Sequence, residues 1–538
     1  MNVWAIISCA LVGAGIVFLM IPLVLQAARA TNLFQREQDL HHTHRRPVPR
    51  LGGLALAAAF IGVEIFIAVV CPEQRAKSPN RLVVVLSSLA MFALGFWDDL
   101  KALGARRKLL GQILIAAAVC AFGIGIEAFT IPFTSTIIQI GGWGALLTVL
   151  WLVGMTNLIN LIDGVDGLAG GICLMLMGLL AYVGHGGGSF EFLVSGMAGA
   201  LLAFLWFNFP PARIYLGDGG AYFLGFQIGL CSILSAHKGT VFAALIAPLF
   251  VLALPIIDTA LAILRRGLRG LPIFRPERKH ILHHLLDSGL SRRRTVLYLY
   301  AVTLIFLLMG FAAYWSRGQL VPVLLGAGTL VLLLCARMLR FSRDWFSPGR
   351  VVGNSIEMRQ EIHYALTLMH WLELEGARRN SAEELWSDLV FAAQRLGFIS
   401  AKMTLADGQR VWEQAGVCQP ARSVAQTLQS GRLGTLELKA PSCEIGAPPG
   451  QAPTPCERSF CPCAADGKMF EIVSELVAEG WIKAASKLEH GSKAPLRFDT
   501  RRAVPQNPPH RGFSLFAAPR RVSGTGRKPA ASPPEAGR

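Results

Sequence analysis

The sequence has few charged residues for its length. Asp, Glu, Lys and Arg together make up 16% of its 538 residues, whereas hydrophobic residues make up 53%. Soluble domains contain roughly 25% charged residues. The mean hydropathy of +0.47 agrees with this shortage of charge. The composition therefore excludes a wholly soluble protein and predicts many membrane-spanning segments.

The sequence also lacks a pattern of paired cysteines and the usual features of a leader peptide. The eleven cysteines form no disulfide framework and no Cys-x-x-Cys pair, so Cys443, Cys456, Cys461 and Cys463 are expected to be unpaired thiols, with a zinc site as the weaker alternative. The apolar segment that ends at Arg29 has no basic stretch before it and no small-residue cleavage site. We therefore expect it to be the first membrane span.

Apolar runs that cross a bilayer need about 20 residues each. We expect about eleven, centred near Ile16, Phe60, Met91, Ala118, Leu150, Met177, Leu202, Ile228, Leu252, Ile305 and Leu330. If the N-terminus lies outside, the loops after odd-numbered spans are cytoplasmic, and these loops hold most of the Lys and Arg. The expected fold is an all-α polytopic membrane protein with an outside N-terminus and a cytoplasmic C-terminus.

Acidic and glycine-rich motifs follow several of these spans. Asn157, Asn160, Asp163 and Asp166 recur at intervals of three, which places them on one helical face, and Gly164 belongs to the glycines that follow. Two further acidic motifs lie beside apolar runs: Asp98-Asp99, and Gly217-Asp218-Gly219-Gly220 with its glycines. Asp258 lies within a predicted span. Carboxylates are ligands for Mg²⁺, and glycines let backbone N–H groups approach an anion. Ordinary helix ends with polar turns are the alternative.

Basic residues gather in the same predicted loops. Arg50 ends a Pro-Val-Pro-Arg segment, Lys108 follows the acidic pair, and His280, His283 and His284 lie among arginines. These side chains suit phosphate, although ordinary cytoplasmic loops are also basic. All of these motifs fall on the predicted cytoplasmic side. We therefore expect one cytoplasm-facing site; an ion-coupled transporter of an anionic substrate is the alternative, but its charges would lie nearer the bilayer midplane.

These motifs, in this order, resemble the polyprenyl-phosphate N-acetylhexosamine-1-phosphate transferases, a group that includes phospho-N-acetylmuramoyl-pentapeptide transferase. The resemblance covers roughly residues 1–340. It implies transfer of a sugar 1-phosphate, expected to be N-acetylglucosamine 1-phosphate, from a UDP-sugar to undecaprenyl phosphate with release of UMP. It also implies a bacterial inner membrane protein that starts cell-envelope polysaccharide synthesis, with no nucleic acid partner and with a homodimer left open.

The resemblance assigns roles residue by residue. The catalytic residues are Asp98, Asp99 and Asp163. Asp218 and Asp99 are the expected ligands of Mg²⁺, for which Mn²⁺ is the alternative. Substrate-binding residues are Arg50, Lys108, Asn160, Gly164, Asp166, Tyr215, His280, His283 and His284, among which Gly164, Asp166 and Tyr215 hold uracil. The histidine motif is one residue longer than the His-x-His-His of the family, so the role of each histidine stays open.

The chain after Phe341 has the composition of a soluble domain. Helical periodicity near residues 356–375, a capping box at Ser381–Glu384, a hairpin over residues 398–405 and 409–413, a strand over residues 433–439 and a helix over residues 469–487 predict a small α/β module. We therefore expect a transmembrane domain at 1–340, a cytoplasmic accessory domain at 341–489, and a disordered basic tail at 490–538.

Overall fold

The computed structural model describes residues 3–31, 48–70, 80–101, 103–130, 137–184, 189–235, 241–269, 285, 290–316, 319–338, 348–405, 407–414, 421–428, 433–441, 467–492 and 497–498. The chain divides into two compact units, of which the first contains Met1–Leu368 and the second most of the residues that follow. The predicted domain boundary after residue 340 lies outside the described residues, as do most of the predicted tail and the cysteines at 443–463. The domain boundary, the tail and the state of these cysteines therefore stay predictions.

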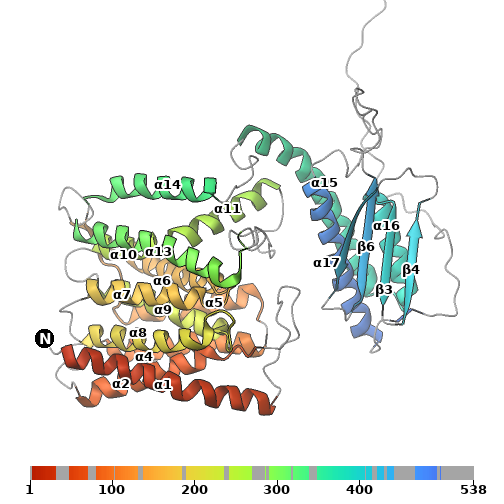
Figure 1. Ribbon diagram of the computed structural model, residues 1–538. Helices are drawn as coiled ribbons and strands as arrows, with labels where there is room; N and C mark the ends of the chain where they lie inside the picture. Colours follow the sequence, from red (N-terminus) through yellow and green to blue (C-terminus); the bar gives the residue numbers. More distant parts are fainter. Residues whose placement is uncertain are drawn as a thin grey trace, which may run out of the picture. The chain divides into compact units, whose positions relative to one another are not determined.

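The first unit is a bundle of helices that run roughly parallel or antiparallel to one another (Figure 1). The described helices up to residue 338 are α1 (Val3–Thr31), α2 (Gly52–Val70), α4 (Arg81–Leu100), α5 (Ala105–Ala121), α6 (Trp143–Ile162), α7 (Leu168–Val183), α8 (Ser189–Asn208), α9 (Gly217–Ser235), α10 (Val241–Val251), α11 (Ala253–Arg269), α13 (Arg292–Trp315) and α14 (Val321–Met338). A short antiparallel pair, β1 (Ala128–Thr130) and β2 (Ile137–Gln139), was not predicted.

Ten of the eleven predicted span centres lie inside one of these helices. Among the described residues, six helices are long and apolar enough to cross a membrane: α1, α2, α4, α6, α8 and α13. Many of their apolar side chains are exposed, as expected for helices that face lipid. The chain is therefore a multi-pass membrane protein, while the count of eleven spans and the orientation stay predictions.

The ninth predicted span is broken in two. Its expected centre, Leu252, lies between α10 and α11. Pro255 has no N–H group with which to continue the hydrogen-bond ladder of α10, and this explains the break. A hydropathy average across the segment does not detect such an interruption.

Helix α9 is the central element of the bundle. Nearly all of its residues are buried, and it packs against α2, α4, α6, α7 and α10. Tyr222, Phe223 and Phe226 fill the space around it, with Phe223 in edge-to-face contact with Phe60 and Phe92. This packing holds the first turn of α9 in one position beside the neighbouring helices.

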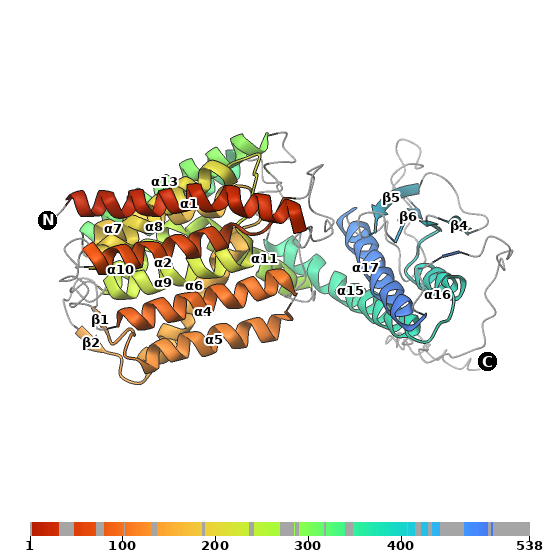
Figure 2. The same ribbon diagram turned by 90° about the horizontal axis from the view of Figure 1, so that it is seen from below.

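The second unit contains a four-stranded antiparallel sheet in the order β4-β3-β6-β5. Its strands are β3 (Ser400–Leu405), β4 (Gly408–Glu413), β5 (Ala421–Thr427) and β6 (Thr435–Pro441), and its helices are α16 (Ala382–Arg395) and the C-terminal parts of α15 (Pro348–Gly376) and α17 (Gly467–Ser492). Helices α15 and α17 lie side by side, joined by an ion pair of 2.9 Å between Lys487 and Glu373 (Figure 2).

The predicted elements of this unit are largely confirmed. The Ser381 hydroxyl accepts a hydrogen bond from the Glu384 backbone N–H at 3.3 Å, which is the N-terminal cap expected for α16. The hairpin, the strand near residue 435 and the last helix are all present. Strand β5 was missed because its residues are half-buried or exposed wherever described, so it lacks an apolar alternation.

Candidate active site

The predicted polar motifs meet at one end of the bundle of the first unit. Asp98 and Asp99 lie in the last turn of α4, Lys108 lies in the first turn of α5, and Asp218 lies in the first turn of α9. Asn160 lies in the last turn of α6. Four helices therefore bring together side chains that are up to 120 residues apart in the sequence.

Asp98, Lys108, Asp218 and Asn160 form a cluster that we call the carboxylate cluster. Lys108 forms an ion pair with Asp98, and its Nζ lies 3.4 Å from Asp218 Oδ2. Asn160 Nδ2 donates to Asp218 Oδ1 at 3.1 Å. The Asp98 and Asp218 carboxyl groups are also in hydrogen-bonding contact. Two carboxyl groups this close require a proton or a cation between them, and Lys108 supplies one positive charge.

Asp98 is held rigidly. Its side chain is 3% exposed, and its Oδ1 accepts a hydrogen bond of 2.6 Å from the Leu103 backbone N–H. The turn that follows α4 therefore fixes the carboxylate before any substrate binds. A preoriented carboxylate needs little reorganisation during a reaction.

Asp99 positions α9. Its Oδ1 accepts from the Asp218 backbone N–H at 3.0 Å and its Oδ2 from that of Gly219 at 2.9 Å, so its carboxylate caps the positive end of the helix. Close approach of α4 and α9 makes this possible, because a Cβ atom at Gly95 would lie 2.5 Å from the Asp218 carbonyl oxygen. Both carboxylate oxygens of Asp99 thus accept backbone hydrogen bonds. Its role as a metal ligand stays a prediction.

The turn between α6 and α7 lies beside the cluster. Asp163 is half-buried, and burial, followed by the nearby carboxylates of Asp218 and Asp99, raises its pKa well above the usual range. Arg50 is close enough to oppose this shift. Asp163 is therefore a carboxyl group that gains from a cation next to it.

Asp166 is a structural part of the same turn. It is 8% exposed, and its Oδ2 accepts from the Ala212 backbone N–H at 3.2 Å and lies 4.0 Å from Arg292 Nη1. These contacts join the turn after α6 to the turn after α8. The predicted contact of Asp166 with uracil is not tested by this geometry, and neighbouring Gly164 is exposed.

Arg50 and Tyr215 are brought together by backbone pairing. The Tyr215 N–H donates to the Pro49 carbonyl at 2.9 Å, and the Gly52 N–H donates to the Tyr215 carbonyl at 2.8 Å. Tyr215 is half-buried, and burial raises the pKa of its hydroxyl to about 12. The hydroxyl is therefore a neutral hydrogen-bonding group at neutral pH.

Several residues that support the site carried no local signal in the sequence. Asn208 accepts from the Gly167 backbone N–H at 2.9 Å and donates to the Ile214 carbonyl at 2.8 Å. The Tyr300 hydroxyl donates to the Gly167 carbonyl at 2.5 Å. Only the position of Asn208, directly before Phe-Pro-Pro at the end of a span, marks it in the sequence. Tyr300 is an ordinary residue of an apolar helix and is recognisable only in three dimensions.

Further acids and the predicted histidines lie apart from the carboxylate cluster or outside the described residues. Glu64, a buried acid of α2, forms an ion pair of 2.5 Å with Arg81 at the beginning of α4, and this contact accounts for its burial. Asp258 is half-buried in α11, which contacts α6. His280, His283 and His284 lie outside the described residues.

The carboxyl groups in and beside the carboxylate cluster are of the kind that suits a hard divalent cation. Within the described ranges, no group of three or more His, Cys, Asp or Glu side chains has a geometry that could hold a metal. However, Asp218 and Asp163 are neighbouring carboxyl groups with a shortage of positive charge, and carboxylate oxygens are the ligands that Mg²⁺ prefers. Lys108 and a metal ion would share the task of neutralising these acids.

Comparisons with known proteins agree with the site. The model of glycosyl transferase family 4 matches residues 81–236, which include the whole carboxylate cluster. The "Probable undecaprenyl-phosphate N-acetylglucosaminyl 1-phosphate transferase" of Bacillus subtilis is 34% identical over 265 residues, which cover 49% of this chain and 72% of that protein.

Two further relatives are similar over a comparable region. The decaprenyl-phosphate N-acetylglucosaminephosphotransferase of Mycobacterium tuberculosis is 32% identical over 59% of this chain and 84% of its own length. The phospho-N-acetylmuramoyl-pentapeptide-transferase of Pelotomaculum thermopropionicum is 30% identical over 58% of this chain and 98% of its own length. The similarity therefore covers both kinds of sugar-phosphate transferase that the motifs suggested.

Proposed function

The chain belongs to the polyprenyl-phosphate N-acetylhexosamine-1-phosphate transferases of glycosyl transferase family 4, and from this premise we propose that it transfers N-acetylglucosamine 1-phosphate from UDP-N-acetylglucosamine to undecaprenyl phosphate. The products are UMP and the lipid-linked sugar diphosphate, the starting unit of a cell-envelope polysaccharide. The names of two relatives support N-acetylglucosamine as the sugar.

The carboxylate cluster is the observation that carries this proposal. It combines a fixed acid, Asp98, a cation, Lys108, and a second acid, Asp218, at the end of a membrane bundle. Phosphoryl transfer needs positioning and charge neutralisation more than covalent chemistry from the protein. A lipid phosphate is held in the bilayer and a nucleotide sugar is dissolved in water, so the two meet only at such an end.

In the proposed reaction, an oxygen of the lipid phosphate attacks the phosphorus that carries the sugar. A new P–O bond forms, the P–O bond to UMP breaks, and UMP leaves with the bonding electrons. Asp98 orients the lipid phosphate and accepts its proton where that phosphate is protonated. Lys108 offsets the repulsion between this phosphate and the carboxylates.

Mg²⁺ is the proposed cofactor, with Mn²⁺ as the alternative. Asp218 and Asp99 would hold it, with Asp163 lining the same centre, and Asp99 would also keep Asp218 in place through the backbone of α9. When bound, the ion would neutralise charge on the diphosphate of the donor. Asn160 restricts the orientation of the Asp218 carboxylate by donating to its Oδ1.

Substrate binding is proposed for the basic and aromatic residues around the cluster. Arg50 is suited to phosphate, Tyr215 with the 164–166 turn to uracil, and His280, His283 and His284 to phosphate or sugar. We propose the bacterial inner membrane as the location, a cytoplasmic site, eleven spans and an outside N-terminus. We also propose that residues 341–489 form a cytoplasmic accessory domain, that residues 490–538 are a basic tail, and that the protein can form a homodimer.

The test uses purified full-length protein in detergent with Mg²⁺, undecaprenyl phosphate and UDP-N-acetylglucosamine. UMP release and lipid-linked product are both measured. We expect equal amounts of each, and loss of both with EDTA and recovery with added Mg²⁺. Activity with a different UDP-N-acetylhexosamine alone would correct the donor, and inactivity with a panel of UDP-sugars would contradict the proposal.

A further inference from the structure

Gln112 of α5 and Asn157 of α6 form a hydrogen bond inside the bundle, next to the carboxylate cluster. The Asn157 Nδ2 donates to the Gln112 Oε1 at 2.6 Å. Gln112 lies four residues after Lys108, and Asn157 lies three residues before Asn160. Residues at these spacings share one face of a helix, so the bond lies one turn, roughly 5 Å, deeper in the bundle than the cluster.

Helices α5 and α6 also meet at the cluster itself. Lys108 Nζ lies 3.4 Å from Asp218 Oδ2, and Asn160 Nδ2 donates to Asp218 Oδ1 at 3.1 Å. The Asp218 carboxylate is thus held between the two helices, with one oxygen toward each. The separation of α5 and α6 therefore determines how closely Lys108 and Asn160 face Asp218.

The orientation of the two carboxamides is well defined. The Asn157 Nδ2 also donates to the Val153 carbonyl of its own helix at 2.8 Å. Because two oxygens face this atom, it is the amide nitrogen, and the Gln112 atom beside it is the oxygen. Nε2 is then the other end of the Gln112 carboxamide. It is buried and has no hydrogen-bond partner among the described residues.

Stability does not account for a glutamine at position 112. A buried donor without a partner costs free energy of folding, whereas an apolar side chain of similar size does not. Gln227 of α9 is also fully buried, but both ends of its carboxamide are used. Its Nε2 donates to the Ser88 hydroxyl at 2.8 Å, and its Oε1 lies 3.9 Å from the Cys231 thiol. Folding explains the glutamine at 227 and leaves the one at 112 without a reason.

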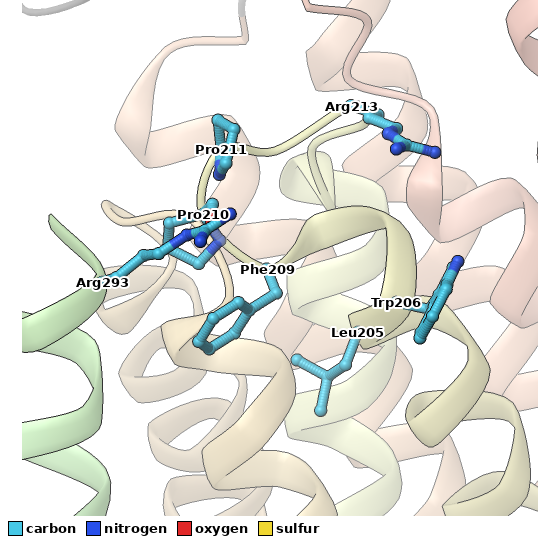
Figure 3. Close-up of a pocket in the computed structure, with 7 residues that line it drawn as sticks. All are labelled: Leu205, Trp206, Phe209, Pro210, Pro211, Arg213 and Arg293. Carbon is cyan, nitrogen blue, oxygen red and sulfur yellow. The ribbon is translucent and has the colours of Figure 1, made fainter.

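Gln112 is not placed to touch a substrate. Its exposed fraction is 0%. A cavity of about 540 Å³ lies at the end of α8 (Figure 3), and its lining residues, among them Phe209 and Arg293, belong to α8, α13 and the turn between α8 and α9. That cavity therefore does not open toward α5. Any effect of Gln112 on a reaction must pass through the residues that it holds in place.

We propose that Gln112 is a positioning residue for the transfer reaction. Its bond to Asn157 holds α5 against α6 and thereby keeps Lys108 in contact with the cluster. Because it concerns the same site, this role rests on the proposed function. The rate of transfer, rather than substrate affinity or folding, should therefore depend on Gln112.

Steady-state kinetics and thermal unfolding of the full-length protein in detergent test this role. In Gln112→Leu, kcat should fall by roughly 10-fold to 100-fold, as expected for a small displacement of a group in the site. KM for UDP-N-acetylglucosamine should stay within about two-fold, because uniform binding is not altered. The melting temperature should not fall. Gln227→Leu is the matched control, with the opposite expectation of a lower melting temperature and a kcat close to that of the parent.

Two double-mutant cycles follow the route from Gln112 to the site. Asn157→Leu combined with Gln112→Leu should be no slower than the slower single variant, because both remove the same bond. Adding Gln112→Leu to Lys108→Met should likewise cause almost no further loss. An unchanged kcat in Gln112→Leu, or additive losses in either cycle, would overturn the inference.

Hydrogen exchange in peptides from the beginning of α5 gives a readout that does not need activity. Exchange should be faster in Gln112→Leu and in Asn157→Leu than in the parent, and unchanged in Gln227→Leu. Equal exchange in the parent and Gln112→Leu would overturn the inference even if the parent released no UMP. A parent without transferase activity would itself contradict the proposed function, so the two failures are distinguishable.

Discussion

Two clusters of charged side chains, one in each unit, differ in their balance of positive and negative charge. In the second unit, Arg379 binds Asp388 through two hydrogen bonds, Nε to Oδ2 at 2.8 Å and Nη2 to Oδ1 at 2.9 Å. The guanidinium matches this carboxylate in shape. Glu375 lies 3.6 Å from Arg379 and 3.5 Å from Arg378, so two guanidinium groups face two carboxylates and the charges balance. In the carboxylate cluster of the first unit, one ammonium group faces two carboxyl groups, Asp98 and Asp218.

The difference separates a structural contact from a site. The Arg379–Asp388 pair is complete, so adding a ligand there would displace a good interaction. The carboxylate cluster has an excess of negative charge, which a second cation or a proton reduces. Removal of an acid should therefore cost stability in the second unit and activity in the first.

Asp218→Asn should produce the largest effect. The carboxamide keeps the size of the side chain but removes the charge that we propose for metal binding, so UMP release should fall by about 1,000-fold. The melting temperature should change little, because repulsion with Asp98 is relieved. UMP release and thermal unfolding are measured on the same preparation, with Asp388→Asn as the active control. Activity close to that of the parent would contradict the site assignment.

Lys108→Met should lower the rate by about 100-fold, because the two carboxyl groups lose their shared cation. Lys108→Arg should recover part of the loss, since the charge returns but the shape of the donor differs. The rate is measured at saturating substrate over a range of Mg²⁺ concentrations. Arg107→Met, at an exposed neighbouring position, is the matched control. An equal loss in both variants would mean that general surface charge matters, rather than the cluster.

Asp388→Asn should destabilise the second unit by about 2 kcal/mol, because a charged hydrogen-bonded pair is replaced by a neutral contact beside Arg379. Urea unfolding followed by hydrogen exchange in peptides of α16 measures the change. Activity should be unaffected by this substitution at low urea. If activity fell as steeply as in Asp218→Asn, the contrast between the two clusters would be lost.

The position of the carboxylate cluster was largely predictable from the sequence. Hydropathy located the helices, and the acids at 98, 163 and 218 all followed the ends or preceded the starts of apolar runs on one predicted side. That is enough to bring them to one end of a bundle. It is not enough to say which carboxylate faces which neighbour.

The role of Asp99 illustrates the limit. Its neighbour Asp98 is chemically identical, yet one carboxylate pairs with Lys108 and the other caps α9. The difference depends on the closeness of α4 and α9, which the glycines at 95 and 219 permit. Adjacent residues on a helix differ in direction by about 100°, so their roles are set by the helices around them.

The break at Leu252 and the edge strand β5 were missed for a related reason. A window average across residues 241–257 finds continuous apolarity, although Pro255 interrupts the ladder of backbone hydrogen bonds. Strand β5 lies at the edge of the sheet, with half-buried and exposed side chains at its described positions. Both elements are defined by backbone hydrogen bonds, which hydrophobic patterns report only indirectly.

Ser381→Ala gives the smallest predicted effect and sharpens the contrast with the first unit. Its hydroxyl accepts the Glu384 N–H at 3.3 Å, so alanine leaves that donor without its cap and should cost about 1 kcal/mol. Hydrogen exchange should accelerate in the first turn of α16, with no change in UMP release. Ser387→Ala in the same helix removes a hydroxyl that only donates to the Glu383 carbonyl, and alanine favours helix there. A larger loss at Ser387 than at Ser381 would show that packing, rather than capping, fixes the beginning of α16.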